Sequence, residues 1–299
     1  METGSGAGRS TLPRASDAPP AGARDPRRAW WIRLAPYAAF VIVSLIVVGT
    51  HMHDFPEVSP TDETVHFDYI ERMPHVPAAG ERLDQPALRA WACRGFPAGL
   101  DYDFPACRSR HFDAEQFPGG GFSYAGATPP LYYAVTAVLS RPIAAITGRS
   151  LFGTVRWCGA LWLAGMMSVA FLIGRRLGAS TLSATAGAVL TGTVLDVVTS
   201  AATIGPDIAS ALVSGLVLLA ALSFDGTRRT FLLLLGATAL AALTKLTTFT
   251  AIGTALLFVL LLPLVGRRLQ AHPLPWLRAL GTCAAVVAVF GGISAVWGA

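Results

Sequence analysis

The sequence has little charge and almost no lysine. Only 14% of its 299 residues are charged, whereas soluble domains carry about 25%. Together with 53% hydrophobic residues, this scarcity argues against an ordinary soluble enzyme, a disordered chain or a nucleic-acid-binding protein. Lys245 is the only lysine among the 23 basic residues, and the others are arginines.

Acidic residues are scarce in the second half of the chain. Residues 151–299 hold three of them, whereas residues 51–128 hold 12 of the 18 acids and five of the six histidines. The composition therefore predicts an all-α, polytopic membrane protein with one acidic, histidine-bearing hydrophilic insert. High Ala, Gly and Arg usage is compatible with a bacterial source.

The first apolar stretch covers residues 29–50 and is long enough to cross a bilayer, which takes about 20 apolar residues. Arg24, Arg27 and Arg28 precede it, and basic residues favour the cytoplasmic side of a span. We expect a retained membrane anchor with a cytoplasmic N-terminus. Residues 1–28 are rich in Pro, Ala, Gly and Arg and are expected to form a disordered tail.

Six more apolar stretches follow within residues 154–299, and basic pairs lie between several of them. If Arg175-Arg176, Arg228-Arg229 and Arg267-Arg268 all face the cytoplasm, the chain crosses the membrane about seven times. The six stretches are residues 154–173, 181–199, 207–224, 230–244, 247–264 and 277–298.

Residues 129–147 are apolar enough for another span, but Arg141-Pro142 interrupts them. An arginine at mid-membrane costs about 2.5–3.5 kcal/mol on insertion scales. We expect instead a helix that lies on the outer membrane surface, or one that dips in and returns. Residues 51–153 then form a large extracytoplasmic loop with juxtamembrane helices.

Two cysteines, Cys93 and Cys107, fall inside this expected outer loop. Oxidation is permitted outside the cytoplasm, so the pair is expected to form a disulfide that stabilises the fold by roughly 3 kcal/mol. Two unpaired thiols are the alternative. Cys158 and Cys283 fall in expected spans and are interpreted as small packing residues.

The stretch PTDETVHFDYI, residues 60–70, holds the most promising chemical groups. Asp62 and Glu63 are adjacent carboxylates that raise one another's proton affinity, and His66 follows one helical turn later. They have the right chemistry for a general base with a partner that holds a cation. The alternative is a simple helix start, with Thr61 as N-cap and acids in the first turn.

This stretch resembles the Pro-Asp-Glu-x-x-His-Phe-x-Tyr signature in the first outer loop of bacterial GT-C glycosyltransferases. That superfamily includes protein O-mannosyltransferases, lipid A aminoarabinose transferases and mycobacterial arabinosyltransferases. A second piece, TPPLYYAV at residues 128–135, is similar to the His-Pro-Pro-Leu-x-Tyr segment of a juxtamembrane helix. Thr128 replaces the usual His.

Further similarities follow in the same order along the chain. Residues 155–178 are similar to the second span, with its leading Arg156 and closing basic pair. Asp207 resembles an acidic position at the outer start of the fourth span, and Lys245 lies in a Thr-Lys-Leu that resembles a recurrent motif after the fifth.

The resemblance implies transfer of a sugar, with inversion, from a polyprenyl-phosphate carrier to a glycan, lipid or protein outside the cytoplasm. The protein would then lie in the bacterial plasma membrane. No cofactor is implied with certainty, and a divalent cation is left open. Asp62 would take the acceptor proton, while Glu63 and His66 would orient that carboxylate, the acceptor or a cation.

The remaining implied roles concern binding. Lys245 and Arg156 are candidates for the donor phosphate, and Asp207, Tyr132 and Tyr69 are further candidates for substrate contact. Arg156 is equally well explained as a side chain that reaches the membrane interface. Lys245 has the alternative of an interfacial anchor, and Asp207 that of a helix N-cap.

Two minor features and two other functions complete the expectations. His51 and His53 are interpreted as interfacial residues rather than metal ligands. Asp196, an acid within an apolar stretch, is expected to face a polar cavity. The alternative functions are a non-catalytic scaffold or transporter that shares the fold, and an inactive truncated fragment.

Overall fold

The computed structural model describes residues 26–60, 62–100, 102–269 and 274–297. The chain divides into two compact units, Met1–Pro36 and Tyr37–Ala299. Helix α1 (Pro26–Asp54) begins in the first unit and ends in the second. Of the expected tail, residues 1–25 lie outside the described residues and residues 26–28 belong to α1.

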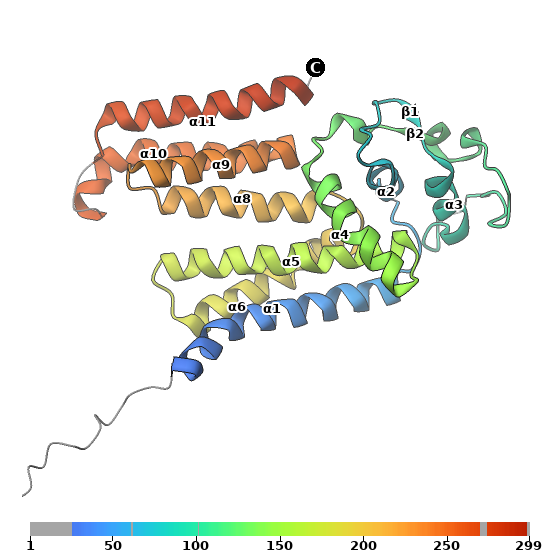
Figure 1. Ribbon diagram of the computed structural model, residues 1–299, viewed down its shortest axis with the longest axis horizontal. Helices are drawn as coiled ribbons and strands as arrows, with labels where there is room; N and C mark the ends of the chain where they lie inside the picture. The colour runs from blue at the N-terminus through green and yellow to red at the C-terminus, as the bar shows by residue number, and fades with distance from the viewer. Residues whose placement is uncertain (1–25, 61, 101, 270–273, 298–299) are drawn as a thin grey trace, which may run out of the picture. The chain divides into compact units, whose positions relative to one another are not determined.

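About 75% of the described residues are helical and very few form strands (Figure 1), which confirms the expected all-α membrane fold. The helices after α1 are α2 (Glu63–Arg72), α3 (Gln85–Arg94), α4 (Leu131–Thr147), α5 (Leu151–Arg176), α6 (Thr181–Gly192), α7 (Leu195–Ala202), α8 (Asp207–Leu222), α9 (Arg228–Thr244), α10 (Phe249–Leu269) and α11 (Trp276–Trp297). Short 3-10 turns lie at Ala114–Gln116, Pro118–Gly121, Ala125–Ala127 and Leu246–Thr248. The strands among the described residues are β1 (Glu81–Arg82) and β2 (Phe122–Ser123), which pair antiparallel.

Among the described residues, four helical segments are long and apolar enough to cross a membrane, and a bent pair makes a fifth if it counts as one span. The four are Arg33–Asp54, Leu151–Arg176, Leu246–Leu264 and Trp276–Trp297. The expectation of seven spans requires two more, for which α8 and α9 are the candidates. These helices have only 16 and 17 residues. At 1.5 Å per residue, α8 is about 24 Å long, less than the ~30 Å hydrocarbon core.

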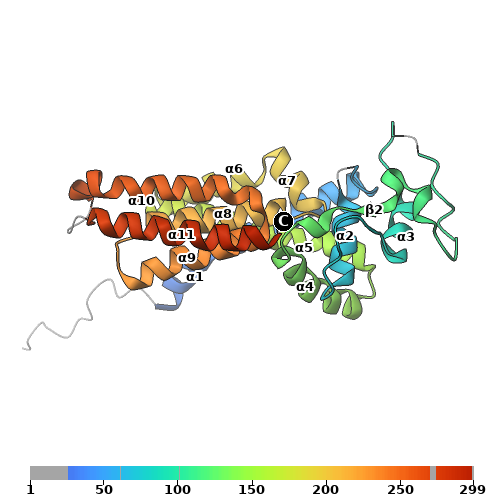
Figure 2. The same ribbon diagram turned by 90° about the horizontal axis from the view of Figure 1, so that it is seen from above.

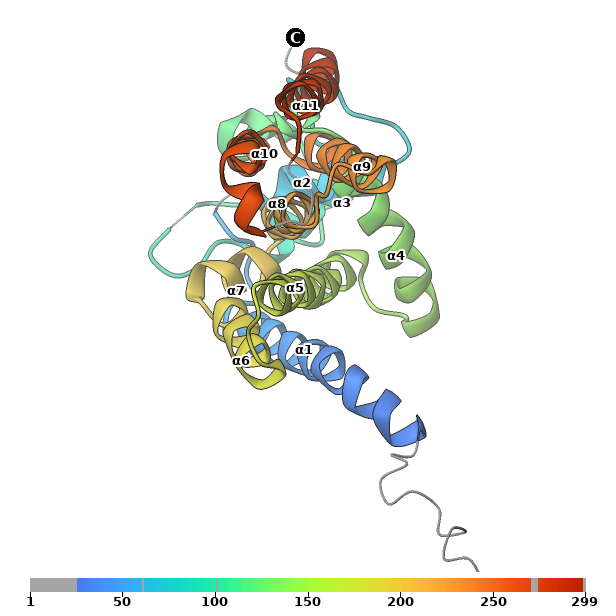
Figure 3. The same ribbon diagram turned by 90° about the vertical axis from the view of Figure 1, so that its left-hand side faces the viewer.

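Helix α5 is central to the second unit and packs against α4, α6, α7 and α8 (Figures 1 and 3). Its buried face includes Leu163 and Met167, both fully buried. Gly159 lets α7 approach closely, because a Cβ at that position would meet the carbonyl oxygen of Ala201 at 1.7 Å. Residues 51–153, here called the loop segment, gather at one end of the bundle (Figure 2).

The stretch 181–199, expected as one continuous span, is broken. Helices α6 and α7 meet at a bend of 66°. The Thr193 hydroxyl donates to the carbonyls of Val189 and Leu190, so part of the end of α6 is satisfied locally. The break tilts α7 so that its Asp196 and Thr199 line a cavity at the loop-segment end of the bundle.

The stretch 129–147 forms one helix, α4, which continues through Pro142. The Arg141 guanidinium donates from Nη2 to the carbonyls of Ile70, Glu71 and Met73, at 3.3, 2.8 and 2.6 Å. These carbonyls belong to the last turn of α2 and to its C-cap residue, so Arg141 holds α2 against α4. This contact gives the arginine within an apolar helix a physical reason.

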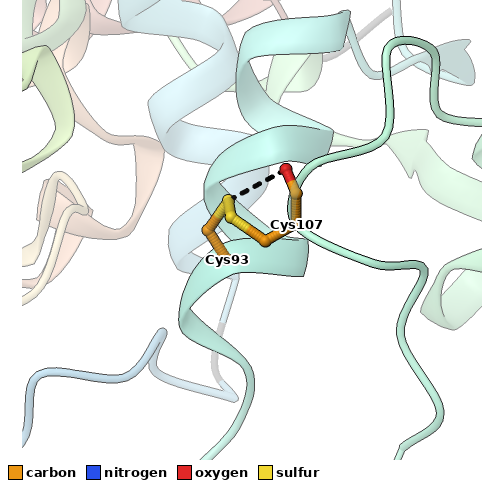
Figure 4. The surroundings of a disulfide bond; sticks show 2 residues. All are labelled: Cys93 and Cys107. Carbon is orange, nitrogen blue, oxygen red and sulfur yellow. Dashed lines mark hydrogen bonds between the residues drawn. A yellow bond between two sulfur atoms is a disulfide. The ribbon is translucent and has the colours of Figure 1, made fainter.

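The disulfide of the loop segment joins Cys93, in the last turn of α3, to Cys107 (Figure 4). Its sequence separation is 14 residues. The bond links the irregular chain around Cys107 to α3. Trp91 and Leu88 of this helix are buried in the core of the loop segment. Cys158 is buried and Cys283 half-buried, and both are free.

Candidate functional site

Asp62 directly precedes α2 and adopts an unusual backbone conformation. Its φ of 56° is in the left-handed region, and its side chain makes no capping bond to the helix. Non-glycine residues at positive φ are uncommon and cluster at functional sites. The carboxylate of Asp62 accepts a hydrogen bond from the Tyr124 hydroxyl. The expected N-cap, Thr61, lies outside the described residues.

A cavity of about 300 Å³ lies beside Asp62. Its walls include four aromatic side chains, Trp91, Phe96, Phe122 and Tyr124, together with aliphatic and polar residues such as Glu63. Burial, followed by the bond to Asp62, raises the pKa of Tyr124 well above its ordinary value, so the phenol stays protonated as the donor in that bond. The exposed Asp62 carboxylate is therefore held by a tyrosine at the edge of a pocket that is partly lined by aromatic rings.

His66, one turn into α2, has a defined partner in α4. Its Nδ1 lies 2.8 Å from the Tyr133 hydroxyl, and the Tyr133 ring stacks on Tyr69 at 3.8 Å between centroids. Burial lowers the pKa of His66 to about 4; the charge of Asp62 raises it, as does that of Asp207, and Lys245 lowers it. A neutral imidazole can donate at one nitrogen and accept at the other.

Asp207 and Lys245 form an ion pair at the same end of the bundle. Asp207 begins α8, while Lys245 follows the last residue of α9. The side chain of Lys245 is 29% exposed and that of Asp207 57%, so an incoming anion can reach the ammonium group. Both charges act on the pKa of His66. The backbone N–H of His66 donates to the carbonyl of Asp62 at 3.1 Å, so Asp62 lies one helical turn before it.

Glycine at position 205 leaves space between His66 and Asp207. A Cβ there would lie 3.5 Å from Cδ2 of His66 and 3.9 Å from Oδ2 of Asp207. The backbone N–H of Gly205 donates to the Tyr132 hydroxyl at 3.2 Å. Tyr132 therefore holds the 203–206 turn, whereas Tyr69, whose hydroxyl donates to the carbonyl of Thr128 at 3.4 Å, supports Tyr133.

Glu63 and Arg156 bind each other, although Glu63 also lines the cavity beside Asp62 and Arg156 lines a second cavity. Arg156 donates from Nε and Nη2 to the Glu63 carboxylate at 2.7 and 2.5 Å, and both side chains are almost fully buried. The guanidinium also donates to the carbonyls of Phe55 and Glu57. Glu63 in turn accepts from the backbone N–H of Ile204 at 3.0 Å. This geometry favours a structural role for both residues over the donor-phosphate and orienting roles.

A second, larger cavity of about 520 Å³ lies on the other side of the Ser59–Pro60 turn, which lines both cavities. Its walls include His51, Glu57 and Asp196. Across the described ranges, no group of three His, Cys, Asp or Glu side chains is arranged to hold a metal ion.

Two partners were missed by reasoning from sequence. Tyr124 lies in no recognised motif and only follows the Gly119–Gly121 run. Tyr133 is adjacent to Tyr132, the tyrosine that the TPPLYYAV motif indicates. Neighbouring residues on a helix point about 100° apart. Tyr133 therefore reaches His66 while Tyr132 reaches Gly205.

Comparison with known proteins gives one result. The family model described as dolichyl-phosphate-mannose-protein mannosyltransferase matches residues 128–291, more than half of the chain. The match begins at Thr128, so it includes Asp207 and Lys245 but not Asp62 and His66. No curated protein matches the sequence.

Proposed function

Because the chain belongs to the dolichyl-phosphate-mannose-protein mannosyltransferase family, of the GT-C type, we propose that it moves a sugar from a polyprenyl phosphate to a hydroxyl group outside the cytoplasm. The family supports a membrane glycosyltransferase in general, which uses a lipid-linked donor and an acceptor. The observation that carries the finer proposal is that Asp62 lies one helical turn before His66, that Gly205 lies beside both His66 and Asp207, and that Asp207 pairs with Lys245.

Asp62 acts as the general base in this proposal. The acceptor oxygen attacks the anomeric carbon while its proton passes to the Asp62 carboxylate, and the bond between that carbon and the phosphate oxygen breaks. General-base catalysis of this kind contributes about 10²- to 10⁴-fold in rate. The hydroxyl of Tyr124 fixes the direction of the carboxylate.

Lys245 receives the negative charge that develops on the leaving phosphate. A positioned cation at a developing charge lowers the barrier without having to reorganise. Asp207 holds the ammonium group until the phosphate arrives. Because His66 is neutral at physiological pH, it does not compete with Lys245 for the phosphate as a second cation.

The test of the proposal is the substitution Asp62→Asn in cells that lack the chromosomal gene. The wild-type gene should restore the sugar that the deletion removes from surface glycans or glycoproteins, as read by mass spectrometry. Asp62→Asn keeps the shape but not the basicity, so it should restore at least about 100-fold less product. Asp103→Asn, an exposed acid in the loop segment, is the matched control.

Equal amounts of each variant in the membrane are required for the comparison. If Asp62→Asn restores the glycan as well as Asp103→Asn does, Asp62 is not the base. If the deletion itself changes no glycan, the non-catalytic alternatives are favoured.

A further inference from the structure

The cavity beside Asp62 has the features of a ligand site. The proposed function does not say what this cavity binds. We propose that this cavity binds the acceptor and that the acceptor is a carbohydrate; the inference rests on the proposed function. The cavity is defined by Asp62, Thr64, Trp91, Phe96, Phe122 and Tyr124, with a volume of about 300 Å³.

The walls suit a ring with one apolar face and several hydroxyl groups. Ligand pockets combine apolar and aromatic walls with a few placed polar groups that fix orientation. Here Trp91 and Phe96 meet edge to face at 5.7 Å, while Phe122 and Tyr124 are 48% and 53% exposed at the cavity. Their faces can pack against the C–H groups of a sugar.

Two buried polar groups at this cavity have no hydrogen-bond partner among the described residues: Trp91 Nε1 and Thr64 Oγ1. Trp91 is 8% exposed and Thr64 is 3% exposed. A buried polar group without a partner is costly, and such groups are rare in folded proteins. Because both atoms have almost no exposed surface, a side-chain rotation would be needed before hydroxyl groups of an acceptor could supply partners for them.

The cavity also has the correct position relative to the reacting groups. Asp62 lines it, whereas His66, Asp207 and Lys245 do not. An acceptor in the cavity therefore reaches the base from one side, and the phosphate meets Lys245 at a separate place. This separation matches a displacement in which the entering oxygen and the leaving phosphate lie on opposite sides of the anomeric carbon.

The size of the cavity favours a sugar over a peptide. Its volume is at the lower end of the ~300–1,000 Å³ range of small-molecule sites. Extended peptides bind along open edges through repeated main-chain hydrogen bonds, whereas the polar groups here are side chains at one small pocket. A protein acceptor is the competing outcome in the test.

The test measures binding without donor, using the full chain in lipid nanodiscs free of sugar detergents. Saturation-transfer NMR compares three probes: methyl α-mannopyranoside, methyl α-arabinofuranoside and the peptide acetyl-Ala-Thr-Ala-amide. We expect at least one glycoside to bind, and its affinity to fall at least tenfold in Trp91→Phe, Thr64→Val and Phe122→Ala. Trp276→Phe, at an exposed position, and Thr185→Val, at a half-buried position outside the cavity, should bind like the wild type.

Phe122→Ala guards against a folding artefact, because its exposed ring is not part of the buried core. Absence of glycoside binding, equal binding by Trp91→Phe and Trp276→Phe, or binding of the peptide alone would overturn the inference. Asp62→Asn should still bind the glycoside. Binding that persists while Asp62→Asn also remains active would therefore refute the base assignment but leave the acceptor pocket in place.

Discussion

Lys245 is paired with Asp207 but remains partly exposed, as expected for a cation that exchanges partners. Replacing it with Gln removes the charge and keeps much of the side-chain length. A charge-assisted hydrogen bond contributes about 1.5–3 kcal/mol, so binding of polyprenyl phosphate should weaken about tenfold or more. Native mass spectrometry of the chain titrated with undecaprenyl phosphate measures the affinity.

Arg228→Gln, at the opposite end of α9, is the control and should bind the lipid like the wild type. Asp207→Asn frees the ammonium group and should not weaken binding. Unchanged affinity in Lys245→Gln would return this residue to the role of an interfacial anchor.

The ion pair between Glu63 and Arg156 is buried, so its loss should lower the free energy of unfolding. Glu63→Gln leaves the Arg156 charge uncompensated, which costs about 3–5 kcal/mol for a buried pair. The double variant with Arg156→Met removes both charges and should recover part of the loss. Thermal unfolding in detergent measures these effects.

Glu115→Gln is the matched control, because Glu115 and Arg82 form an exposed pair of the kind worth about 0–1 kcal/mol. If Arg156 binds the donor phosphate instead, Arg156→Met would weaken lipid binding and leave the unfolding temperature unchanged.

Asp62 and Glu63 illustrate what can be predicted at the level of single residues. Their position in an acidic segment near the first span follows from composition. Their separate environments do not, because the positive φ of Asp62 is a local exception to helix geometry. The partner of Glu63 is 93 residues away in sequence. Residue types therefore indicate the chemistry, while long-range packing decides which carboxylate remains available.

Helix α2 carries two titratable groups, the half-buried His66 and the buried Asp68, whose effects on stability have opposite signs. Burial lowers the pKa of His66 from 6.5 to about 4, so its contribution to stability is lost as the pH falls through that window. Burial raises the pKa of Asp68 from 3.8 to about 6, partly offset by its bonds to Asp84 and Arg72. Its contribution is present below pH 3.8 and lost as the pH rises toward 6.

The two effects should nearly cancel in the wild type between pH 4 and 6.5, since each corresponds to about 3 kcal/mol at 1.36 kcal/mol per unit. Relative to the wild type, His66→Asn should gain stability on acidification and Asp68→Asn should lose it. Unfolding temperatures across this range measure both, with the exposed His111→Asn as control. Parallel profiles for the two variants would contradict the assignment.

The helices differ in how well their patterns predict them. Apolar length identifies α5, α10 and α11, because a continuous run needs only its own backbone bonds. It does not reveal the 66° bend between α6 and α7, since both halves are apolar and no Pro marks the break, although Asp196 lies in the first turn of α7. The end of α6 is instead set by packing, because a Cβ on Gly192 would lie 2.1 Å from Cε of Met167.

At the level of the whole molecule, the distribution of charge predicts a membrane protein with one large loop, and the helical fold agrees. The convergence of α2, α8 and α9 at one end could not be predicted from local patterns. Asp62, Asp207 and Lys245 are far apart in sequence, and their elements are brought to one end by the packing of α4 against α2, α5 and α9.

The side of the membrane on which each loop lies is the remaining expectation at this scale. Arg141 is engaged by the end of α2, so α4 should lie at the outer surface and not cross. Residues 116 and 149, before and after α4, are then both outside, and residue 177, after Arg175-Arg176, is inside. Gln116, Arg149 and Leu177 are exposed, so each tolerates replacement by cysteine.

Single cysteines at these three positions, in a background with Cys158→Ala and Cys283→Ala, can be labelled with an impermeant maleimide on spheroplasts. Gln116→Cys and Arg149→Cys should be labelled on intact spheroplasts, and Leu177→Cys only after permeabilisation. Labelling of Gln116→Cys but not Arg149→Cys would mean that α4 crosses the membrane. Every later loop would then change sides, and Asp207 and Lys245 would face the cytoplasm, opposite the compartment of Asp62. Asp62 lies one turn before His66, His66 and Asp207 both lie beside Gly205, and Lys245 pairs with Asp207. That outcome would therefore be inconsistent with the observed fold, and the labelling experiment tests topology and site together.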